Sequence, residues 1–224
     1  MDYNEGINTH WERSYFAMNK PNIAVASLIY GDPGIPGFNY TNAVLRAGGR
    51  PFMVSNVDSA EEAQYIYDHF DGLLLTGGGD IAPDLFGQEL DGSADIDRDR
   101  DMAELELLGG FLALNKPVLG ICLGMQLLFE WGEEVRRCRG LSLVSGGVKR
   151  IETACKLPHI GWNSLTFQND SPLFRGLDDG AYVYFVHSFF GENCADSLSA
   201  WTDYGIPITA AVEQGNLFGC QFHP

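Results

Sequence analysis

Basic residues are scarce in this chain of 224 residues, where 14 lysines and arginines stand against 30 aspartates and glutamates, for a formal net charge of -16. A protein that binds nucleic acid or an anionic membrane surface needs a positive face, so this balance argues against both kinds of partner. Long apolar runs are also missing, which excludes a membrane-spanning helix, and the polar start from Met1 to Glu5 is not that of a signal peptide.

Cysteine is sparse as well, and its spacing excludes two kinds of site. The five cysteines are an odd number and form no Cys-x-x-Cys pair, so they predict neither a disulfide framework nor a zinc site. Such cysteines suit a reducing compartment, and we expect a cytoplasmic protein. Repeats, low-complexity segments and nucleotide-binding motifs are missing too, and we therefore expect no cofactor.

What remains is an ordinary globular composition, with 45% hydrophobic residues and 27 glycines. We expect an N-terminal extension over residues 1–20 and a single domain over residues 21–224. In the first half, predicted strands (21–29, 51–54 and 72–76) alternate with predicted helices (40–47, 59–69 and 100–114), which indicates a parallel sheet covered on both faces. The second half predicts short strands joined by turns, at 140–151, 161–167, 181–188, 208–213 and 217–222, and hence a partly antiparallel extension.

The pattern Gly-x-Cys-x-Gly stands at residues 120–124, after a short apolar run and before apolar residues at helical spacing (Met125, Leu128 and Phe129). It is typical of a sharp strand-to-helix turn that holds a nucleophile in a strained conformation. The first amides of the helix would then favour the thiolate of Cys122. A lone cysteine is more often a core residue, but the flanking glycines favour a nucleophile here.

A cysteine nucleophile needs a general base, and two of the five histidines suit that role. His187 lies near the end of a predicted strand, and His223 directly follows another. We expect His10 and His69, in the first half, at the surface. The residues alone leave His187 and His223 open as the base, with a structural role as the alternative for each.

Two segments carry a resemblance to a known family. Gly-Ile-Cys-Leu-Gly-Met-Gln-Leu-Leu-Phe-Glu at 120–130 resembles the nucleophile elbow of class I (triad) glutamine amidotransferases, and Gln-Phe-His-Pro at 221–224 resembles the segment that supplies their histidine. Pro-His-Ile-Gly-Trp-Asn at 158–163 is similar to the glutaminase subunit of imidazole glycerol phosphate synthase. The resemblance implies an α/β fold with a mostly parallel central sheet, helices on both faces and a partly antiparallel extension in the second half.

The resemblance also implies a role for each matching residue. Cys122 is then the nucleophile and His223 the base. Trp162 and Tyr184 match positions at a partner interface, with ordinary core aromatics as the alternative. The oxyanion and substrate contacts fall on Gly78, Gly79, Leu123, Gln126, Ser188 and Phe189.

The first half departs from this subfamily. Leu75-Thr-Gly-Gly-Gly-Asp-Ile-Ala-Pro83 resembles γ-glutamyl hydrolases that cleave γ-glutamyl-GABA and similar amides, although Leu123 stands where those enzymes usually have arginine. At the other end, the family pattern continues His-Pro-Glu, with the glutamate orienting the histidine, whereas this sequence stops at Pro224. We therefore expect a C-terminal truncation of the domain.

The predicted function is that of a glutaminase subunit, which hydrolyses glutamine to glutamate and ammonia for histidine biosynthesis. The implied partner is a (β/α)8 cyclase subunit, in a heterodimer. One alternative is a stand-alone hydrolase of γ-glutamyl-GABA-like amides. A second is a non-catalytic homologue that lacks the triad glutamate.

Overall fold

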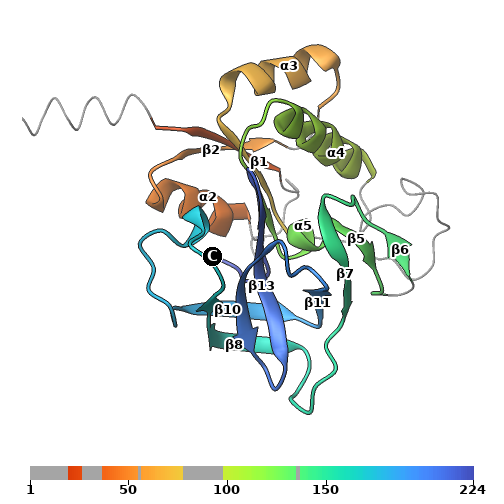
Figure 1. Ribbon diagram of the computed structural model, residues 1–224. Helices are drawn as coiled ribbons and strands as arrows, with labels where there is room; N and C mark the ends of the chain where they lie inside the picture. Colours follow the sequence, from red (N-terminus) through yellow and green to blue (C-terminus); the bar gives the residue numbers. More distant parts are fainter. Residues whose placement is uncertain (1–19, 27–36, 55–56, 78–97, 135–136) are drawn as a thin grey trace, which may run out of the picture.

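The computed structural model describes residues 20–26, 37–54, 57–77, 98–134 and 137–224, and an eight-stranded sheet forms its centre (Figure 1). The strands run across the sheet in the order β2 (Arg50–Val54), β1 (Asn22–Ala26), β3 (Gly72–Leu75), β4 (Val118–Ile121), β14 (Leu217–Cys220), β13 (Pro207–Gln214), β12 (Leu198–Asp203) and β9 (Thr166–Phe167). Neighbours are parallel from β2 to β14 and antiparallel from β14 to β9. The predicted mixed sheet is thus confirmed.

Helices cover both faces of the parallel half, as the alternating pattern predicts. The apolar side chains of α3 (Ala60–His69) and α4 (Arg98–Ala113) share a core cluster with Leu73 and Leu75 of β3. Leu74, between those two leucines, belongs instead to a second cluster with Tyr40 of α2 (Gly37–Arg46). Because successive side chains of a strand point to opposite faces, α2 lies across the sheet from α3 and α4 (Figure 1).

Ser59 and Glu62 form a capping box, with one change, at the start of α3. The Ser59 hydroxyl accepts a hydrogen bond from the Glu62 backbone N–H at 3.2 Å. The Glu62 carboxylate accepts from the backbone N–H of Asp58 at 2.8 Å, one residue before the cap. The first bond satisfies a donor that a helix N-terminus leaves without an intrahelical partner, and the second fixes the residue that precedes the cap.

The second half adds two smaller sheets beside the main one. A four-stranded sheet has the order β11 (Phe189–Glu192), β7 (Val144–Arg150), β5 (Phe129–Gly132) and β6 (Cys138–Arg139). A two-stranded ribbon pairs β8 (His159–Ser164) with β10 (Tyr182–His187) in antiparallel register. A short 3-10 turn, η2 (Pro172–Phe174), lies between them in sequence.

The helix after residue 122 is shorter than its apolar spacing predicts. The α5 helix (Leu123–Gln126) has four residues, and Phe129 already begins β5. The carbonyls of Leu127 and Leu128 accept hydrogen bonds from the backbone N–H groups of Leu141 and Leu143, both at 2.9 Å, so long-range pairing replaces continuation of the helix. The same pairing shortens the strand predicted over 140–151, which begins only at Val144.

Candidate active site

Cys122 lies at the turn from β4 to α5, at the carboxyl end of a central parallel strand. Its backbone has φ 56° and ψ -109°, a strained conformation for a residue other than glycine. A Cβ at Gly120 would stand 2.4 Å from the carbonyl oxygen of Gly124, and one at Gly124 would stand 2.7 Å from that of Leu75. The structure therefore has the sharp turn that Gly-x-Cys-x-Gly predicts, and both glycines are needed for the backbone to pass.

The first amide of α5 acts on Cys122 in the predicted direction, but the turn does not by itself give a thiolate in the free protein. Burial raises the pKa of the Cys122 thiol, and it outweighs the backbone N–H of Leu123, which lowers that pKa. The charge of Glu134 raises it further, while a hydrogen bond from Gln221 lowers it. Because desolvation dominates, the sulfur rests as a thiol at neutral pH and needs a base to remove its proton.

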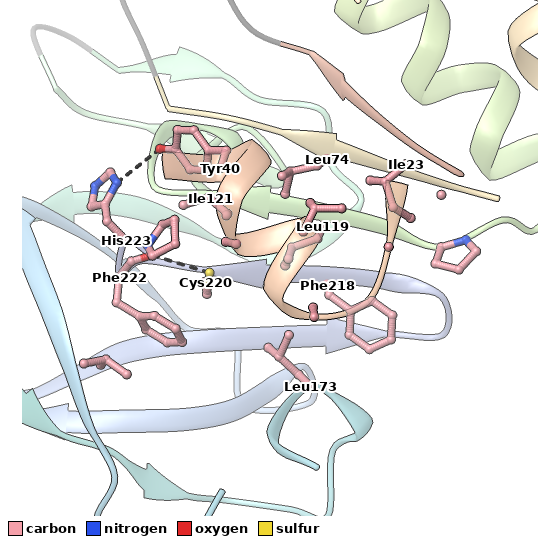
Figure 2. Close-up of a pocket in the computed structure, with 18 of the residues that line it drawn as sticks. Ile23, Tyr40, Leu74, Leu119, Ile121, Leu173, Phe218, Cys220, Phe222 and His223 are labelled. Carbon is pink, nitrogen blue, oxygen red and sulfur yellow. Dashed lines mark hydrogen bonds between the residues drawn. The ribbon is translucent and has the colours of Figure 1, made fainter. Parts of the chain in front are cut away.

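His223 reaches this site from the segment that follows β14. Its backbone N–H donates to the carbonyl of Tyr184 at 3.0 Å, and the Tyr40 hydroxyl lies 3.2 Å from its ring Nδ1 (Figure 2). A Cβ placed at Gly77 would be 3.4 Å from Cys122 Cβ, 3.6 Å from the Tyr40 hydroxyl and 3.7 Å from His223 Cε1. The cysteine and the histidine therefore face the same small space at the end of β3.

The ring nitrogens distinguish the two candidate bases. His187 Nδ1 donates to the Phe189 carbonyl at 2.8 Å, and its Nε2 lies 3.1 Å from Nδ1 of His159, so both nitrogens are used. By contrast, Nε2 of His223 is buried with no hydrogen-bond partner among the described residues. Burial also lowers the pKa of His223, which favours the neutral ring that a general base requires. The geometry thus favours His223.

The residues predicted to hold the oxyanion and the substrate are only partly described. Gly78 and Gly79 lie outside the described residues. Leu123 opens α5, with its backbone N–H toward the Cys122 sulfur. The Ser188 carbonyl accepts from the backbone N–H of Ile151 at 2.9 Å.

Gln126 and Phe189 are joined by a hydrogen bond. Gln126 Nε2 donates to the Phe189 carbonyl at 3.3 Å and to Gln221 Oε1 at 3.0 Å. Both N–H groups of Gln126 are therefore used inside the protein, and its side-chain oxygen remains as the group that a substrate could meet.

The two predicted interface aromatics lie opposite each other on the β8–β10 ribbon. Trp162 and Tyr184 are register partners, and their rings meet edge to face with centroids 5.7 Å apart. Trp162 is 69% exposed, so it is not a core residue. Ile160, Tyr182 and Val186 are exposed too, at alternate positions that share this face of the ribbon.

A cavity of about 630 Å³ lies beyond His223, between α2 and the face of the sheet that α2 covers. Figure 2 shows its apolar walls, which include Ile23, Leu119, Phe218 and Phe222. Cys122 is not among its lining residues. An apolar space away from the nucleophile does not fit a polar amino-acid substrate, so we do not assign glutamine to this cavity.

The sequence did not predict that Tyr40 and Gln221 contact the two proposed catalytic residues. Tyr40 is 183 residues from His223, and no local pattern connects them. Gln221 lies inside the recognised Gln-Phe-His-Pro segment, and a polar residue directly after an apolar strand was the available signal. Its Nε2 lies 3.5 Å from the sulfur of Cys122.

The described residue ranges contain neither a cluster of metal ligands nor a membrane-spanning helix. Within them, no group of three or more His, Cys, Asp or Glu side chains is placed to hold a metal ion. No helix in the same ranges has the length and apolarity to cross a membrane.

Comparison with curated proteins finds relatives over part of the chain. Imidazole glycerol phosphate synthase subunit HisH from Bacillus cereus (strain B4264) is 46% identical over 111 residues, which are 50% of this chain and 53% of that protein. The protein of the same name from Bacillus mycoides (strain KBAB4) is 44% identical over 112 residues, 50% of this chain and 54% of that protein. The chain thus spans about half the length of the curated relatives it matches.

Solved structures match the fold over most of the chain. A putative GMP synthase protein from Thermoplasma acidophilum gives a TM-score of 0.58 at 20% identity, covering 92% of this chain and 84% of that one. A glutamine amidotransferase from Thermotoga maritima gives 0.58 at 18% identity, covering 91% and 75%. At these identities the likeness shows the fold, and it confirms the predicted fold class.

The family follows from a direct match. The peptidase C26 family model matches residues 36–224, which include the turn at Cys122 and the segment that ends in His223. Relatives and fold agree with the resemblance to class I glutamine amidotransferases. This chain belongs to the peptidase C26 family.

Proposed function

We propose that this chain is a glutaminase, which uses Cys122 to hydrolyse the side-chain amide of glutamine and supplies the ammonia for imidazole glycerol phosphate synthesis. The observation that carries the proposal is the strained turn at φ 56°, which presents a cysteine between two glycines to the same small space that the ring of His223 faces. The resemblance to the glutaminase subunit supplies the substrate, and the name of the HisH relatives supports the pathway.

The first half of the reaction forms a thioester. Nε2 of His223 removes the thiol proton, and the Cys122 sulfur attacks the amide carbon of glutamine. The oxyanion that develops lies toward the backbone N–H of Leu123, with Gly78 proposed as a second donor. When the tetrahedral intermediate collapses, the C–N bond breaks and protonated His223 returns its proton to the leaving ammonia.

The second half releases glutamate. Water loses a proton to His223 and adds to the thioester carbon, and the C–S bond then breaks with the proton returned to sulfur. This cycle suits the pKa values of the free protein, since a neutral thiol beside a neutral histidine is the required starting state.

The exposed face of the β8–β10 ribbon is the proposed surface for the cyclase subunit. Trp162 and Tyr182 are 69% and 68% exposed, and large aromatics are common at the centre of interfaces. The backbone carbonyl of Tyr184, on the same ribbon, accepts a hydrogen bond from the backbone N–H of His223. A partner that binds the ribbon therefore lies next to the proposed base. The proposed heterodimer is thus supported by position as well as by the relatives' name.

A direct test measures glutamate release from glutamine by the purified chain. Cys122→Ala should abolish both this release and labelling by a glutamine-like electrophile. Cys155→Ser, at an exposed cysteine, is the matched control and should keep both. Labelling that persists in Cys122→Ala would reject the proposed nucleophile.

A second candidate is a stand-alone hydrolase of γ-glutamyl-GABA-like amides. It is favoured by the peptidase family and by the segment from Leu75 to Pro83. The discriminating assay compares glutamate release from glutamine and from γ-glutamyl-GABA, with and without the cyclase of the same genome. Fast cleavage of γ-glutamyl-GABA with no stimulation by the cyclase would replace the first proposal with the second.

The interface is tested by the affinity for the cyclase. Trp162→Ala should weaken binding by about thirtyfold or more, the loss that a central aromatic anchor gives. Leu114→Ala, at an exposed leucine just beyond α4, is the control and should bind like the parent chain. Equal affinity of both variants would exclude the ribbon as the docking face.

A further inference from the structure

Gln221 is a wholly buried amide that lies against the nucleophile. It stands one residue after β14, and its backbone N–H donates to the Ala210 carbonyl of β13 at 2.9 Å, which fixes the main chain. Its side-chain Nε2 lies 3.5 Å from the sulfur of Cys122, and its Oε1 accepts from Gln126 Nε2 at 3.0 Å. Both ends of a buried polar group are therefore occupied.

The orientation of this amide follows from a backbone carbonyl. The Phe189 oxygen accepts hydrogen bonds and cannot donate them, so the amide end of Gln126 that faces it at 3.3 Å must be the NH2 group. That same NH2 faces Gln221 at 3.0 Å, and the Gln221 atom there must then be the oxygen. Consequently the NH2 group of Gln221 points at the Cys122 sulfur.

A second donor holds the start of this chain of bonds. Nδ1 of His187 donates to the same Phe189 carbonyl at 2.8 Å, and β11 is anchored to β7 by antiparallel pairing. Gln126 therefore donates in both directions, to the Phe189 carbonyl of β11 and to Gln221, and Gln221 in turn donates toward the sulfur. A reversed Gln126 would place its oxygen against the oxygens of Phe189 and Gln221, and a reversed Gln221 would place its NH2 against that of Gln126; both arrangements are strongly disfavoured for buried groups.

We propose that Gln221 is a catalytic residue whose amide stabilises the thiolate of Cys122, and that Gln126 positions it. This role rests on the proposed function, since it assigns a new residue to the same reaction. An amide donates hydrogen bonds but does not take the thiol proton, so Gln221 complements His223 and does not replace it. It would favour the state in which the sulfur carries charge, before that charge passes to the oxyanion.

The Gln221 amide opposes the effect of burial on the pKa of the Cys122 thiol. Burial raises the pKa of Cys122, and Gln221 is one of two groups, with the backbone N–H of Leu123, that lower it. A hydrogen bond to a charged group is stronger than one to a neutral group, so the amide is worth more to the thiolate than to the thiol. The Gln221 amide thus stabilises the thiolate of Cys122 in addition to the backbone N–H of Leu123 at the start of α5.

The test follows alkylation of Cys122 by iodoacetamide against pH in the full chain, with the modified peptide quantified by mass spectrometry. Gln221→Met keeps the side-chain length and removes the donor, and Gln221→Glu puts a carboxylate beside the sulfur. The alkylation midpoint should rise by about one pH unit in Gln221→Met and further in Gln221→Glu. Gln64→Met, at an exposed glutamine of α3, is the matched control and should keep the parent midpoint.

A second variant covers the case in which Gln221→Met does not fold. Gln126→Met leaves Gln221 in place but removes the group that orients it, and should shift the midpoint in the same direction by a smaller amount. A folded Gln221→Met or Gln126→Met with the parent midpoint would overturn the proposal. Alkylation needs no turnover, so absent glutaminase activity in the parent chain would overturn the proposed function, while the alkylation midpoints still decide the role of Gln221.

Discussion

The hydroxyl of Tyr40 lies 3.2 Å from Nδ1 of His223, so a residue of α2 holds the ring of the proposed base. Tyr40 is 1% exposed and packs in the core cluster of the α2 face. When the hydroxyl accepts from Nδ1–H, the unprotonated nitrogen of the neutral ring is Nε2. That is the nitrogen with no partner among the described residues, and it is the one a general base needs.

Tyr40→Phe should therefore slow turnover without weakening substrate binding. The ring keeps its packing, while the lost hydrogen bond allows the wrong tautomer and orientation of His223. We expect kcat for glutamine hydrolysis to fall about tenfold, as loss of about 1.4 kcal/mol would give, with KM nearly unchanged. Steady-state kinetics measure both values. Tyr65→Phe, at an exposed tyrosine of α3, is the control, and equal kcat in the two variants would contradict the role of Tyr40.

The pH dependence of turnover should report the neutral form of His223. Burial lowers the pKa of this histidine below the ordinary value of 6.5, and the protonated ring cannot accept the thiol proton. The value of kcat/KM should thus rise with pH and level off, with its midpoint below 6.5. A profile measured from pH 4.5 to 8.5 tests this. A midpoint above 6.5, or a loss of rate as the histidine becomes neutral, would indicate a preformed thiolate–imidazolium pair instead.

Local signals in the sequence were enough for much of the fold. The strand predicted over 72–76 contains β3, and the helix predicted over 59–69 matches α3 within one residue. The turn at Cys122 was predictable because glycine is the residue that leaves room for a neighbouring backbone within 3 Å, and this chain has glycines two residues to either side. The end of α5 was not, since carbonyls that pair with residues 141–144 decide it.

The side-chain contacts within the site join residues that are far apart in the sequence, so no local pattern predicts them. Gln221 meets Cys122 across 99 residues, and His159 meets His187 because the β8–β10 register places them opposite each other. The balance of effects on the thiol pKa was also beyond the sequence, because it depends on how deeply the sulfur is buried. Resemblance identified His223, but the occupied nitrogens of His187 became visible only in three dimensions.

The two glycines of the turn should tolerate no side chain. A Cβ at Gly120 would lie 2.4 Å from the carbonyl oxygen of Gly124, and backbone cannot yield as a flexible side chain does. Gly120→Ala should lower the free energy of unfolding by about 3 kcal/mol or more, as overpacking of this severity does. Urea denaturation measures the change.

Gly109→Ala is the matched control for that substitution. Gly109 lies within α4, and a Cβ there would meet nothing within 4 Å. Because alanine has the higher helix propensity, Gly109→Ala should stabilise the protein by about 1 kcal/mol. If Gly120→Ala lowers the free energy of unfolding while Gly109→Ala raises it, steric crowding at Gly120 is separated from helix propensity. An unchanged free energy of unfolding in Gly120→Ala would show that the turn relaxes to accept the methyl group.

The buried histidine pair should make the protein less stable in mild acid. Burial lowers the pKa of His187 to about 4, from 6.5 in its ordinary environment. The unfolded chain then binds a proton at a pH where the folded protein does not, so the stability from the neutral ring is complete above pH 6.5 and is lost as pH falls toward 4. The loss for this residue alone is on the order of 3 kcal/mol. His159 and His223, whose pKa values burial also lowers, act in the same direction.

His187→Asn isolates this contribution. The asparagine amide has no proton to gain, so the variant should be less stable than the parent at pH 7.5 but should lose less stability between pH 6.5 and 4.5. Urea denaturation at several pH values gives both slopes, and the common titration of carboxylates cancels in the difference between the proteins. His69→Asn, at an exposed histidine of α3, should follow the parent slope. If His187→Asn follows that slope too, the ring of His187 is protonated in the folded state and its bonds to Phe189 and His159 have been misassigned.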